Sequence, residues 1–311
     1  MAKSIPFGAG STADHVLAGI DLTGKHIVVT GCTSGLGFET MSALTANGAH
    51  VIALARTLAG AAAACAEVGP FTTPIACDLG DLQSIATAAA AIQNLRVPLD
   101  AIVTNAGVAS LPTLQTRYGV EQQFLVNHLG HFYLLNELLD SVRNGTGRIV
   151  IVSSHSSKTQ APAEGVMFDN LDGHRFYQPS MFYGQSKLAN ALHAKELSRR
   201  LQSRGIAVNS LHPGATRGTH LNRKLTLPLK MRLRAAQLFM RPASYGAATQ
   251  TLLAGSPRVS GISGKYWSNC QIAEANPLVE DVDLARRLWD VSHEILAQHT
   301  ARAPTRLLEA A

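Results

Sequence analysis

Short apolar runs rich in β-branched residues alternate along this chain with longer stretches rich in Ala and Leu. The runs have the length of buried strands, and the stretches between them have the composition of helices. We predict strands at Ile27–Thr30, Val51–Leu54, Thr73–Ala76, Ala101–Thr104, Arg148–Ser153, Ala207–Leu211 and Gly264–Trp267. Strands that alternate with helices form right-handed βαβ crossovers. The predicted fold class is therefore α/β: a single doubly wound Rossmann-type domain with about seven parallel strands and helices on both faces.

The first predicted strand leads into a glycine-rich turn, Gly31-Cys32-Thr33-Ser34-Gly35-Leu36-Gly37. Gly31 permits a tight turn, Gly35 lets the backbone approach a phosphate, and Gly37 lets the following helix pack closely on the sheet. The helix N-terminus offers unpaired N–H groups to an anion. The turn predicts a diphosphate cradle. An ordinary turn is the alternative, since the Gly-x-x-x-Gly-x-Gly spacing differs from the commonest dinucleotide fingerprint.

Tyr183 and Lys187 are four residues apart, which places them on one face of a helix. A neighbouring ammonium favours the phenolate and lowers the pKa of a tyrosine from its usual value of about 10. A phenol held in this way can act as a general acid or base. The spacing alone is a weak signal, because such pairs also arise by chance.

Further motifs accompany these two features in a fixed order. They are Thr30-Gly31 to Gly37, Asp78-Leu79, Asn105-Ala106-Gly107, Asn127, Val152-Ser153-Ser154, Tyr183 with Lys187, and Pro213-Gly214. In these motifs the chain resembles the short-chain dehydrogenase/reductase family over most of its length. Four stretches, at 126–134, 168–171, 186–190 and 286–290, are more narrowly similar to the branch that holds retinol dehydrogenases and the WW-domain-containing oxidoreductase. The resemblance implies an enzyme that transfers hydride between a nicotinamide cofactor and a carbonyl or alcohol.

The resemblance assigns catalysis to Asn127, Ser154, Tyr183 and Lys187. Tyr183 would be the general acid or base, and Ser154 would polarise the substrate oxygen. Lys187 would lower the pKa of Tyr183 and hold the nicotinamide ribose, while Asn127 would position a water in a proton relay. We choose Ser154 over the serines around it because it is the second serine of the Val-Ser-Ser motif.

The end of the second predicted strand, Leu54-Ala55-Arg56, decides which cofactor is favoured. NAD-binding folds normally place a carboxylate here for the adenosine ribose, whereas an arginine accommodates a 2′-phosphate. Guanidinium and phosphate form charge-assisted hydrogen bonds, so Arg56 favours NADP(H). NAD(H) is the alternative, with Arg56 as a solvated surface residue, because the glycine turn carries no second basic residue.

The predicted cofactor contacts run from the glycine turn to the turn after the sixth strand. They are Gly31, Thr33, Ser34, Gly35, Leu36, Gly37, Arg56, Asp78, Leu79, Asn105, Ala106, Gly107, Tyr183, Lys187, Pro213, Gly214 and Thr216. By resemblance, Asp78 would bind the adenine amino group and Asn105 to Gly107 would border the adenosine ribose. Gly218 stands where the family usually has Ser or Thr, which leaves the register after Gly214 open.

A basic and apolar segment follows this turn. Residues 217–241 carry seven Arg and Lys side chains and no acidic one, interleaved with Leu and Met. We predict a substrate lid over 217–245 that closes on a small lipophilic substrate. A basic amphipathic helix resting on a membrane surface is the alternative.

Composition bounds the remaining possibilities. The 311 residues, 46% of them hydrophobic, suffice for one catalytic domain over 23–270 with an N-terminal extension, 1–22, and a C-terminal helical extension, 271–311. Four cysteines without metal-ligand spacing predict no metal site and fit a reducing cytoplasm. The formal charge of +6 comes without a nucleic-acid-binding motif and suits a protein that attracts anionic cofactors. No apolar run within residues 1–25 is long enough to span a membrane.

The sequence also suggests roles for two histidines, a mode of oligomerisation and an alternative function. His128 and His131 are predicted to be core or hydrogen-bonded histidines, because no third residue has metal-ligand spacing. The resemblance implies that a homo-oligomer would pair through the helices that carry Asn127 and Tyr183. The alternative function is a cofactor-binding regulatory scaffold with little turnover, against which the intact catalytic residues argue.

Overall fold

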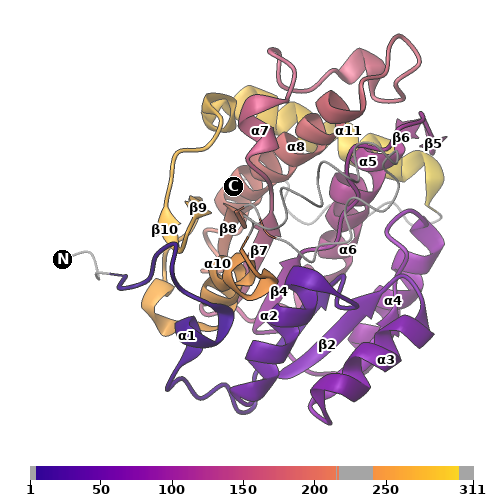
Figure 1. Ribbon diagram of the computed structural model, residues 1–311. Helices are drawn as coiled ribbons and strands as arrows, with labels where there is room; N and C mark the ends of the chain where they lie inside the picture. Colours follow the sequence, from indigo (N-terminus) through magenta and orange to yellow (C-terminus); the bar gives the residue numbers. More distant parts are fainter. Residues whose placement is uncertain (1–4, 215, 217–240, 301–311) are drawn as a thin grey trace.

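The computed structural model describes residues 5–214, 216 and 241–300. At its centre is an eight-stranded sheet in the order β10-β9-β8-β7-β4-β1-β2-β3 (Figure 1). The strands are β1 (His26–Thr30), β2 (His50–Ala55), β3 (Thr72–Ala76), β4 (Ala101–Thr104), β7 (Arg148–Val152), β8 (Ala207–His212), β9 (Tyr266–Ser268) and β10 (Gln271–Ile272). Their order reverses between β1 and β4, where a doubly wound sheet forms its ligand-binding crevice.

All seven predicted strands are present and run parallel to one another. β10 is an eighth strand that pairs antiparallel with β9 and that the sequence did not predict. Its two residues are exposed and leave no apolar pattern to read. A separate hairpin joins β5 (Thr116–Arg117) to β6 (Val120–Glu121). The predicted fold class is confirmed.

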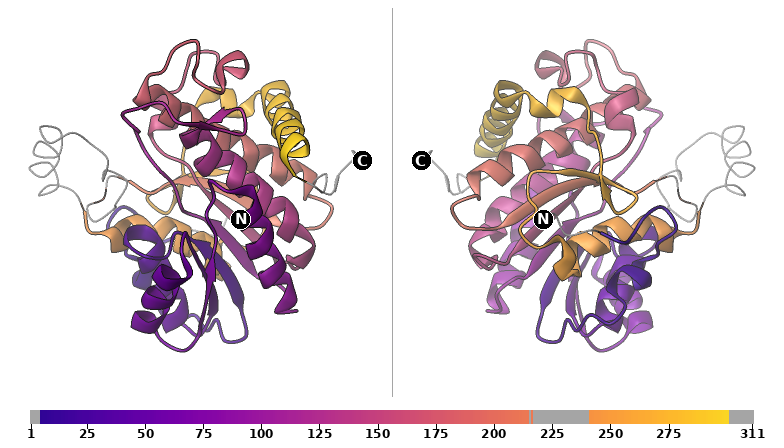
Figure 2. Two further views of the ribbon diagram at one scale, coloured as in Figure 1. Left: turned by 90° about the vertical axis from the view of Figure 1, so that its right-hand side faces the viewer. Right: turned by 90° about the vertical axis from the view of Figure 1, so that its left-hand side faces the viewer.

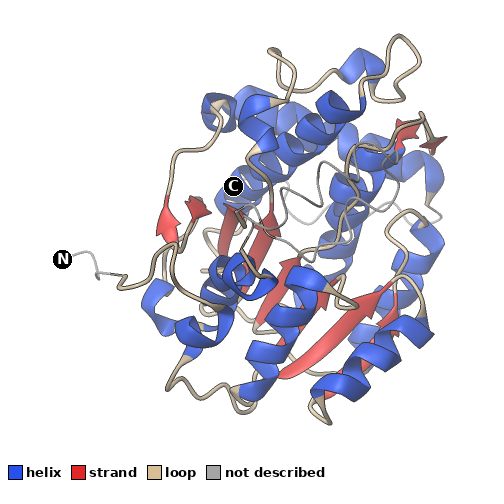
Figure 3. Ribbon diagram, viewed as in Figure 1, coloured by secondary structure: helices blue, strands red, loops and turns tan. Residues whose placement is uncertain are grey.

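Helices cover both faces of the sheet, as Figure 3 shows. On one face pack α1 (Ala13–Leu17), α2 (Gly35–Ala46), α3 (Leu58–Val68) and α10 (Ala243–Gly255). On the other face pack α4 (Leu82–Asn94), α6 (Gly130–Leu138), α8 (Pro179–Arg200) and α11 (Val282–His299). The shorter elements are α5 (Gln122–Phe124), η1 (Leu125–Leu129), η2 (Leu139–Ser141), α7 (Ser156–Thr159), η3 (Phe168–Asn170), η5 (Pro257–Val259) and η6 (Pro277–Glu280).

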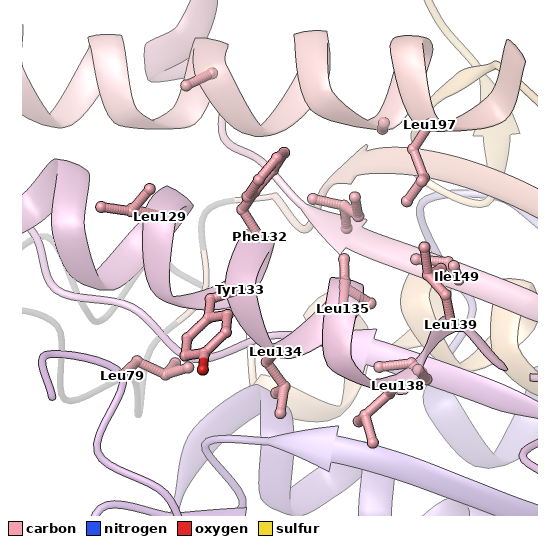
Figure 4. Close-up of a cluster of buried hydrophobic side chains, with 14 of the residues drawn as sticks. Leu79, Leu129, Phe132, Tyr133, Leu134, Leu135, Leu138, Leu139, Ile149 and Leu197 are labelled. Atoms are coloured by element: carbon pink, nitrogen blue, oxygen red, sulfur yellow. The ribbon is translucent and has the colours of Figure 1, made fainter. Parts of the chain in front are cut away.

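The parallel strands are buried on both faces, because alternate residues along each strand point to opposite helix layers. Val28 of β1 belongs to the core under α4, α6 and α8, whereas Ile27 and Val29 belong to the core under α2 and α10. Figure 4 shows part of the first core, where Phe132 of α6 lies between the sheet and α8.

α11 packs against the side of α8 that faces away from the sheet (Figure 2). Asp281 caps α11 by accepting hydrogen bonds from the backbone N–H groups of Asp283 and Leu284. The ring of Trp289 lies 4.9 Å from that of Phe132 on α6, and the guanidinium of Arg200 on α8 lies 4.3 Å above the Trp289 ring. α8 is therefore enclosed between the sheet and a second helix of the same chain.

Membrane-spanning helices and clustered metal ligands are both absent from the described ranges. None of the helices there combines enough length and hydropathy to cross a bilayer. The same ranges contain no group of three or more His, Cys, Asp or Glu side chains placed to bind a metal ion. Residues 217–240 of the predicted lid lie outside the described part of the chain, so the lid stays a prediction.

Candidate active site

The turn between β1 and α2 has the shape that its glycines predict. Gly31 has φ +75°, a conformation that other residues rarely adopt. A Cβ at Gly37 would overlap the carbonyl oxygen of Gly31 and lie 2.6 Å from Nδ2 of Asn105. Ser34 precedes α2 in an extended conformation without a side-chain cap, so the first N–H groups of this 12-residue helix have no capping partner. A backbone this close and a helix start without a cap fit the diphosphate of a dinucleotide.

Thr30 and Asn105 hold the cofactor turn against the turn that follows β4. The hydroxyl oxygen of Thr30 accepts the N–H groups of Asn105 and Ala106, both at 2.9 Å. The side chain of Asn105 donates to the carbonyl of Thr30 at 2.9 Å and accepts from Nε2 of Gln250 at 3.1 Å. Sequence reasoning missed Gln250, because nothing within α10 marks a residue that acts across 145 positions.

The residues predicted to face the adenosine half lie where β2 and β3 end. Arg56 follows β2 and is exposed, and no carboxylate within the described ranges forms an ion pair with it. Asp78 follows β3, and its Oδ1 accepts the N–H of Gly80 at 2.9 Å. The side chain of Leu79 is buried in the core (Figure 4), so only its backbone is available to border a cofactor.

Tyr183 and Ser154 meet at the carboxyl edge of the sheet. Tyr183 lies in the first turns of α8, and Ser154 follows β7. The Ser154 hydroxyl lies near enough to the Tyr183 phenol to influence its pKa, and the Ser154 oxygen accepts the N–H of Ser156 at 3.2 Å. Burial raises the pKa of Tyr183, and the side chain of Ser154 lowers it by less. The lowering of this pKa that the Tyr–Lys spacing predicted is not the direction found here, because desolvation of the phenol raises the pKa by more than Ser154 lowers it.

Lys187 lies one turn along α8 and points its ammonium into the protein. Its Nζ donates to the carbonyl oxygen of Val152 at 3.0 Å. A Cβ at Gly107 would lie 3.5 Å from this Nζ and 3.0 Å from Oδ1 of Asn127. The absence of a side chain at Gly107 thus leaves room between the predicted ribose turn, the ammonium and Asn127.

Asn127 lies in η1, a π-helical turn between α5 and α6. Its side chain accepts the N–H of Val108 at 2.8 Å and donates to the carbonyl of Val108 and to the hydroxyl of Ser186, both at 2.9 Å. The Ser186 hydroxyl in turn donates to the carbonyl of Tyr183 at 2.8 Å. π-helical turns occur frequently at functional sites. Here the turn links the segment after β4 directly to the helix that carries Tyr183.

The histidines beside Asn127 are hydrogen-bonded within the core, as predicted. His131 joins its Nδ1 to the carbonyl of Asn127 at 3.0 Å and its Nε2 to the Thr30 hydroxyl at 2.9 Å. Because that hydroxyl already accepts two N–H groups, its proton points to Nε2, and the His131 proton lies on Nδ1. Burial lowers the pKa of His131 to about 4, so its ring is neutral. His128 donates from Nε2 to the hydroxyl of Ser292 at 2.9 Å.

The remaining predicted contacts lie beyond β8. Gly214 has φ +87°, and its N–H points to Nδ1 of His212 at 3.4 Å. Thr216 forms an isolated parallel bridge with Arg241. Of the serines that compete with Ser154, Ser153 donates to the carbonyl of Lys187 at 2.6 Å, and Ser157 donates to the carbonyl of Ser154 at 2.6 Å. Both hydroxyl groups donate to backbone carbonyls, whereas Ser154 is the serine that acts on the pKa of Tyr183.

Burial of Lys187 predicts a measurable effect on stability. Its pKa falls from 10.5 to about 8, because burial disfavours the ammonium. Below pH 8 Lys187 is protonated in both the folded and the unfolded chain, and the folded chain is destabilised by the full cost of burying the ammonium. Between pH 8 and 10.5 only the unfolded chain keeps the proton, so the free energy of unfolding rises with pH. We expect Lys187→Met to raise the free energy of unfolding by up to about 3 kcal/mol at pH 7 and by progressively less toward pH 10.5.

Urea unfolding without cofactor at a series of pH values measures this difference. The carbonyl of Val152 keeps a donor in the variant, since Nδ2 of Asn190 lies 3.1 Å from it. Lys265→Met, which removes an exposed ammonium, is the matched control and should show no such trend. A Lys187→Met variant that is less stable than the wild type at pH 7 would contradict the expectation.

Comparisons with known proteins point to one family. Residues 25–167 match the family model described as short chain dehydrogenase. The chain is 37% identical to short-chain dehydrogenase TIC 32 B, chloroplastic, of Brassica napus, with 93% of this chain and 94% of that protein covered. It is 38% identical to human retinol dehydrogenase 14, with 86% and 85% covered, which agrees with the predicted branch.

A solved structure carries the same fold. It is a short chain dehydrogenase from Burkholderia cenocepacia in complex with NADP, and its TM-score is 0.62 at 26% identity, with 79% of this chain and 96% of that chain covered. The fold, the order of the motifs and the similar proteins all indicate the same family over most of the sequence. The chain belongs to the short-chain dehydrogenase family.

Proposed function

We propose that the protein is an NADP(H)-dependent oxidoreductase that transfers hydride between the nicotinamide and a small lipophilic ketone, aldehyde or secondary alcohol. Membership of the family supports NAD(P)-dependent oxidoreductase activity. The observation that carries the proposal is the nearness of the Tyr183 and Ser154 hydroxyls at the carboxyl edge of the sheet, where Ser154 acts on the pKa of the phenol. It places a phenol proton beside a second hydroxyl that can hold a carbonyl oxygen.

Each of the four proposed catalytic residues has its own role in the reaction. When bound, the nicotinamide cofactor supplies or accepts the hydride. Ser154 holds the substrate oxygen by a hydrogen bond, and Tyr183 donates a proton to that oxygen during reduction or removes it during oxidation. The buried ammonium of Lys187 offsets the negative charge that Tyr183 acquires when it gives up its proton. Asn127 fixes the position of Val108 and, through Ser186, of the Tyr183 backbone in the catalytic helix.

NADPH consumption with a panel of lipophilic aldehydes and ketones tests this function, with cofactor binding measured in parallel. Turnover of any aldehyde or ketone in the panel supports the proposal that the protein is an enzyme. Tight cofactor binding without turnover across the panel would favour the regulatory scaffold instead. We infer a lipophilic substrate from the Leu and Met residues of 217–240. A cytoplasmic location is a separate prediction, made from the four cysteines without disulfide spacing.

Arg56 carries the preference for NADP(H). We expect Arg56→Ala to weaken NADPH binding by about tenfold or more, because a charge-assisted contact to a phosphate contributes roughly 1.5–3 kcal/mol. NADH binding should change little, since NADH has no 2′-phosphate. Isothermal titration with both cofactors measures the two affinities, and Arg96→Ala, which also removes an exposed guanidinium, serves as the control. Equal losses for both cofactors, or a wild type that prefers NADH, would contradict the assignment.

A further inference from the structure

A cavity of about 320 Å³ lies beside Ser154, between α7 and the edge strands β9 and β10. We name it the edge cavity; its lining consists of His155, Lys158, His212, Tyr266, Ser268, Ala273 and Glu274. His155 directly follows Ser154, and the hydroxyl of Tyr266 lies 3.3 Å from the Ser154 carbonyl oxygen, to which it donates. The cavity is therefore a neighbour of the reacting centre, but none of the catalytic residues lines it.

His212, at the end of β8, presents a hydrogen-bond donor to this cavity. Its Nδ1 accepts the N–H of His155 at 3.1 Å and that of Gly214 at 3.4 Å. Nδ1 is thus an acceptor, and the ring proton lies on Nε2. Burial, together with the nearby His155, lowers the pKa of His212 to about 4, so the ring stays neutral near pH 7. Within the described ranges no hydrogen bond to Nε2 is formed.

Lys158, on α7, adds a positive charge to the lining of the same cavity. Its Nζ donates to the backbone carbonyl of Glu274 at 3.1 Å, which holds the ammonium at the cavity and leaves its other N–H groups available. No ion pair is formed by Lys158 with any carboxylate of the described residues. The hydroxyl of Ser268 adds another donor to the lining. A cavity with one cation and several neutral donors is complementary to a single negative charge with two oxygen atoms.

Resting on the proposed function, we propose that the edge cavity binds a carboxylate on the substrate. The substrate would then be an oxo acid or hydroxy acid whose carbonyl or alcohol reacts at Tyr183 while its carboxylate is held by Lys158 and the Nε2–H of His212. Glu274 lines the same cavity, and its side chain is exposed. A doubly charged phosphate would be repelled by the Glu274 carboxylate and attracted only by the Lys158 ammonium. A ligand with a single negative charge therefore fits the cavity better.

Matched pairs of substrates test the site. Each pair consists of an ω-oxo carboxylic acid and its methyl ester, which share the reacting aldehyde, in a series of increasing chain length. For the chain length that spans the two sites we expect the acid to have a KM at least about tenfold below that of its ester, the scale of one charge-assisted contact. Lys158→Met should raise KM for the acid to the level of the ester, with kcat and the KM of the ester unchanged.

Two further variants test the second predicted donor and provide a control. His212→Asn keeps an oxygen for the N–H groups of His155 and Gly214 but removes the donor at Nε2, and it should raise KM for the acid alone. Lys265→Met removes an exposed ammonium that lines the neighbouring cavity and not this one, and it should leave the acid-to-ester ratio unchanged. An acid-to-ester ratio that is the same in the wild type, Lys158→Met and His212→Asn would overturn the proposal.

A binding measurement separates this proposal from the proposed function. Isothermal titration of a saturated fatty acid, and of its methyl ester, into the NADP⁺-loaded enzyme needs no turnover. Preferential binding of the acid that is lost in Lys158→Met supports the site even if no aldehyde is reduced. Turnover of esters and acids with equal KM leaves the oxidoreductase function standing and removes the carboxylate site.

Discussion

Replacing Tyr183 by Phe is expected to lower kcat by about 10²–10⁴, the usual contribution of a positioned general acid or base. The substitution removes only the phenol hydroxyl near Ser154, and the ring keeps its place in the first turns of α8. Binding of NADPH should change little, because no charge is lost. Steady-state rates under conditions where hydride transfer is limiting, together with calorimetric titration of the cofactor, measure the two effects separately.

Tyr118→Phe is the matched control. Tyr118 lies in the turn between β5 and β6, where its ring is covered by the guanidinium of Arg117. Loss of its hydroxyl should leave kcat unchanged. If Tyr183→Phe kept more than half of the wild-type kcat, Tyr183 could not be the residue that moves the proton.

Gly37→Ala should weaken the cofactor site by filling the space between the backbone of Gly31 and the side chain of Asn105. The new methyl group would overlap the carbonyl oxygen of Gly31 and crowd the side chain of Asn105. Neither neighbour can rotate away, because one is backbone and the other is tied to Thr30 and Gln250. We expect a loss of about 1–3 kcal/mol in the free energy of unfolding, the range for an overpacked site. Affinity for NADPH should fall by at least about tenfold, since 1.4 kcal/mol corresponds to one factor of ten.

Chemical denaturation and calorimetric titration with NADPH measure the two effects of Gly37→Ala. Gly10→Ala is the control, since a Cβ at Gly10 would meet no heavy atom within 4 Å. A Gly37→Ala protein that binds NADPH as tightly as the wild type would show that the turn after β1 is not the diphosphate cradle.

The strands and the cofactor turn could be predicted from the sequence because each is specified locally. Val28, Val29 and Ile27 are apolar on both faces of β1, and the glycines that follow are spaced for a strand-to-helix turn. The four-residue spacing of Tyr183 and Lys187 likewise needs only a helix to put both on one face. In each case the physical constraint acts over a few neighbouring residues.

Other parts of the site depend on contacts between distant segments and left no local trace. The amide of Gln250 reaches Asn105 from α10, and His212 takes its tautomer from the backbone of His155. The direction of the pKa shift at Tyr183 was predicted wrongly, because the spacing indicates a neighbouring charge but not how deeply the phenol is buried. Burial is a property of the assembled fold.

The position of α11 bears on how the catalytic helix is kept in place. The outer side of α8, through which the resemblance implied pairing with a second chain, is covered by Trp289 and its neighbours from the same chain. Asn127 is held in the same way from outside, since the adjacent His128 is bonded to Ser292 of α11. A partner docking here would first have to displace α11. On this side of α8, the support behind Tyr183 and Lys187 therefore comes from α11 of the same chain.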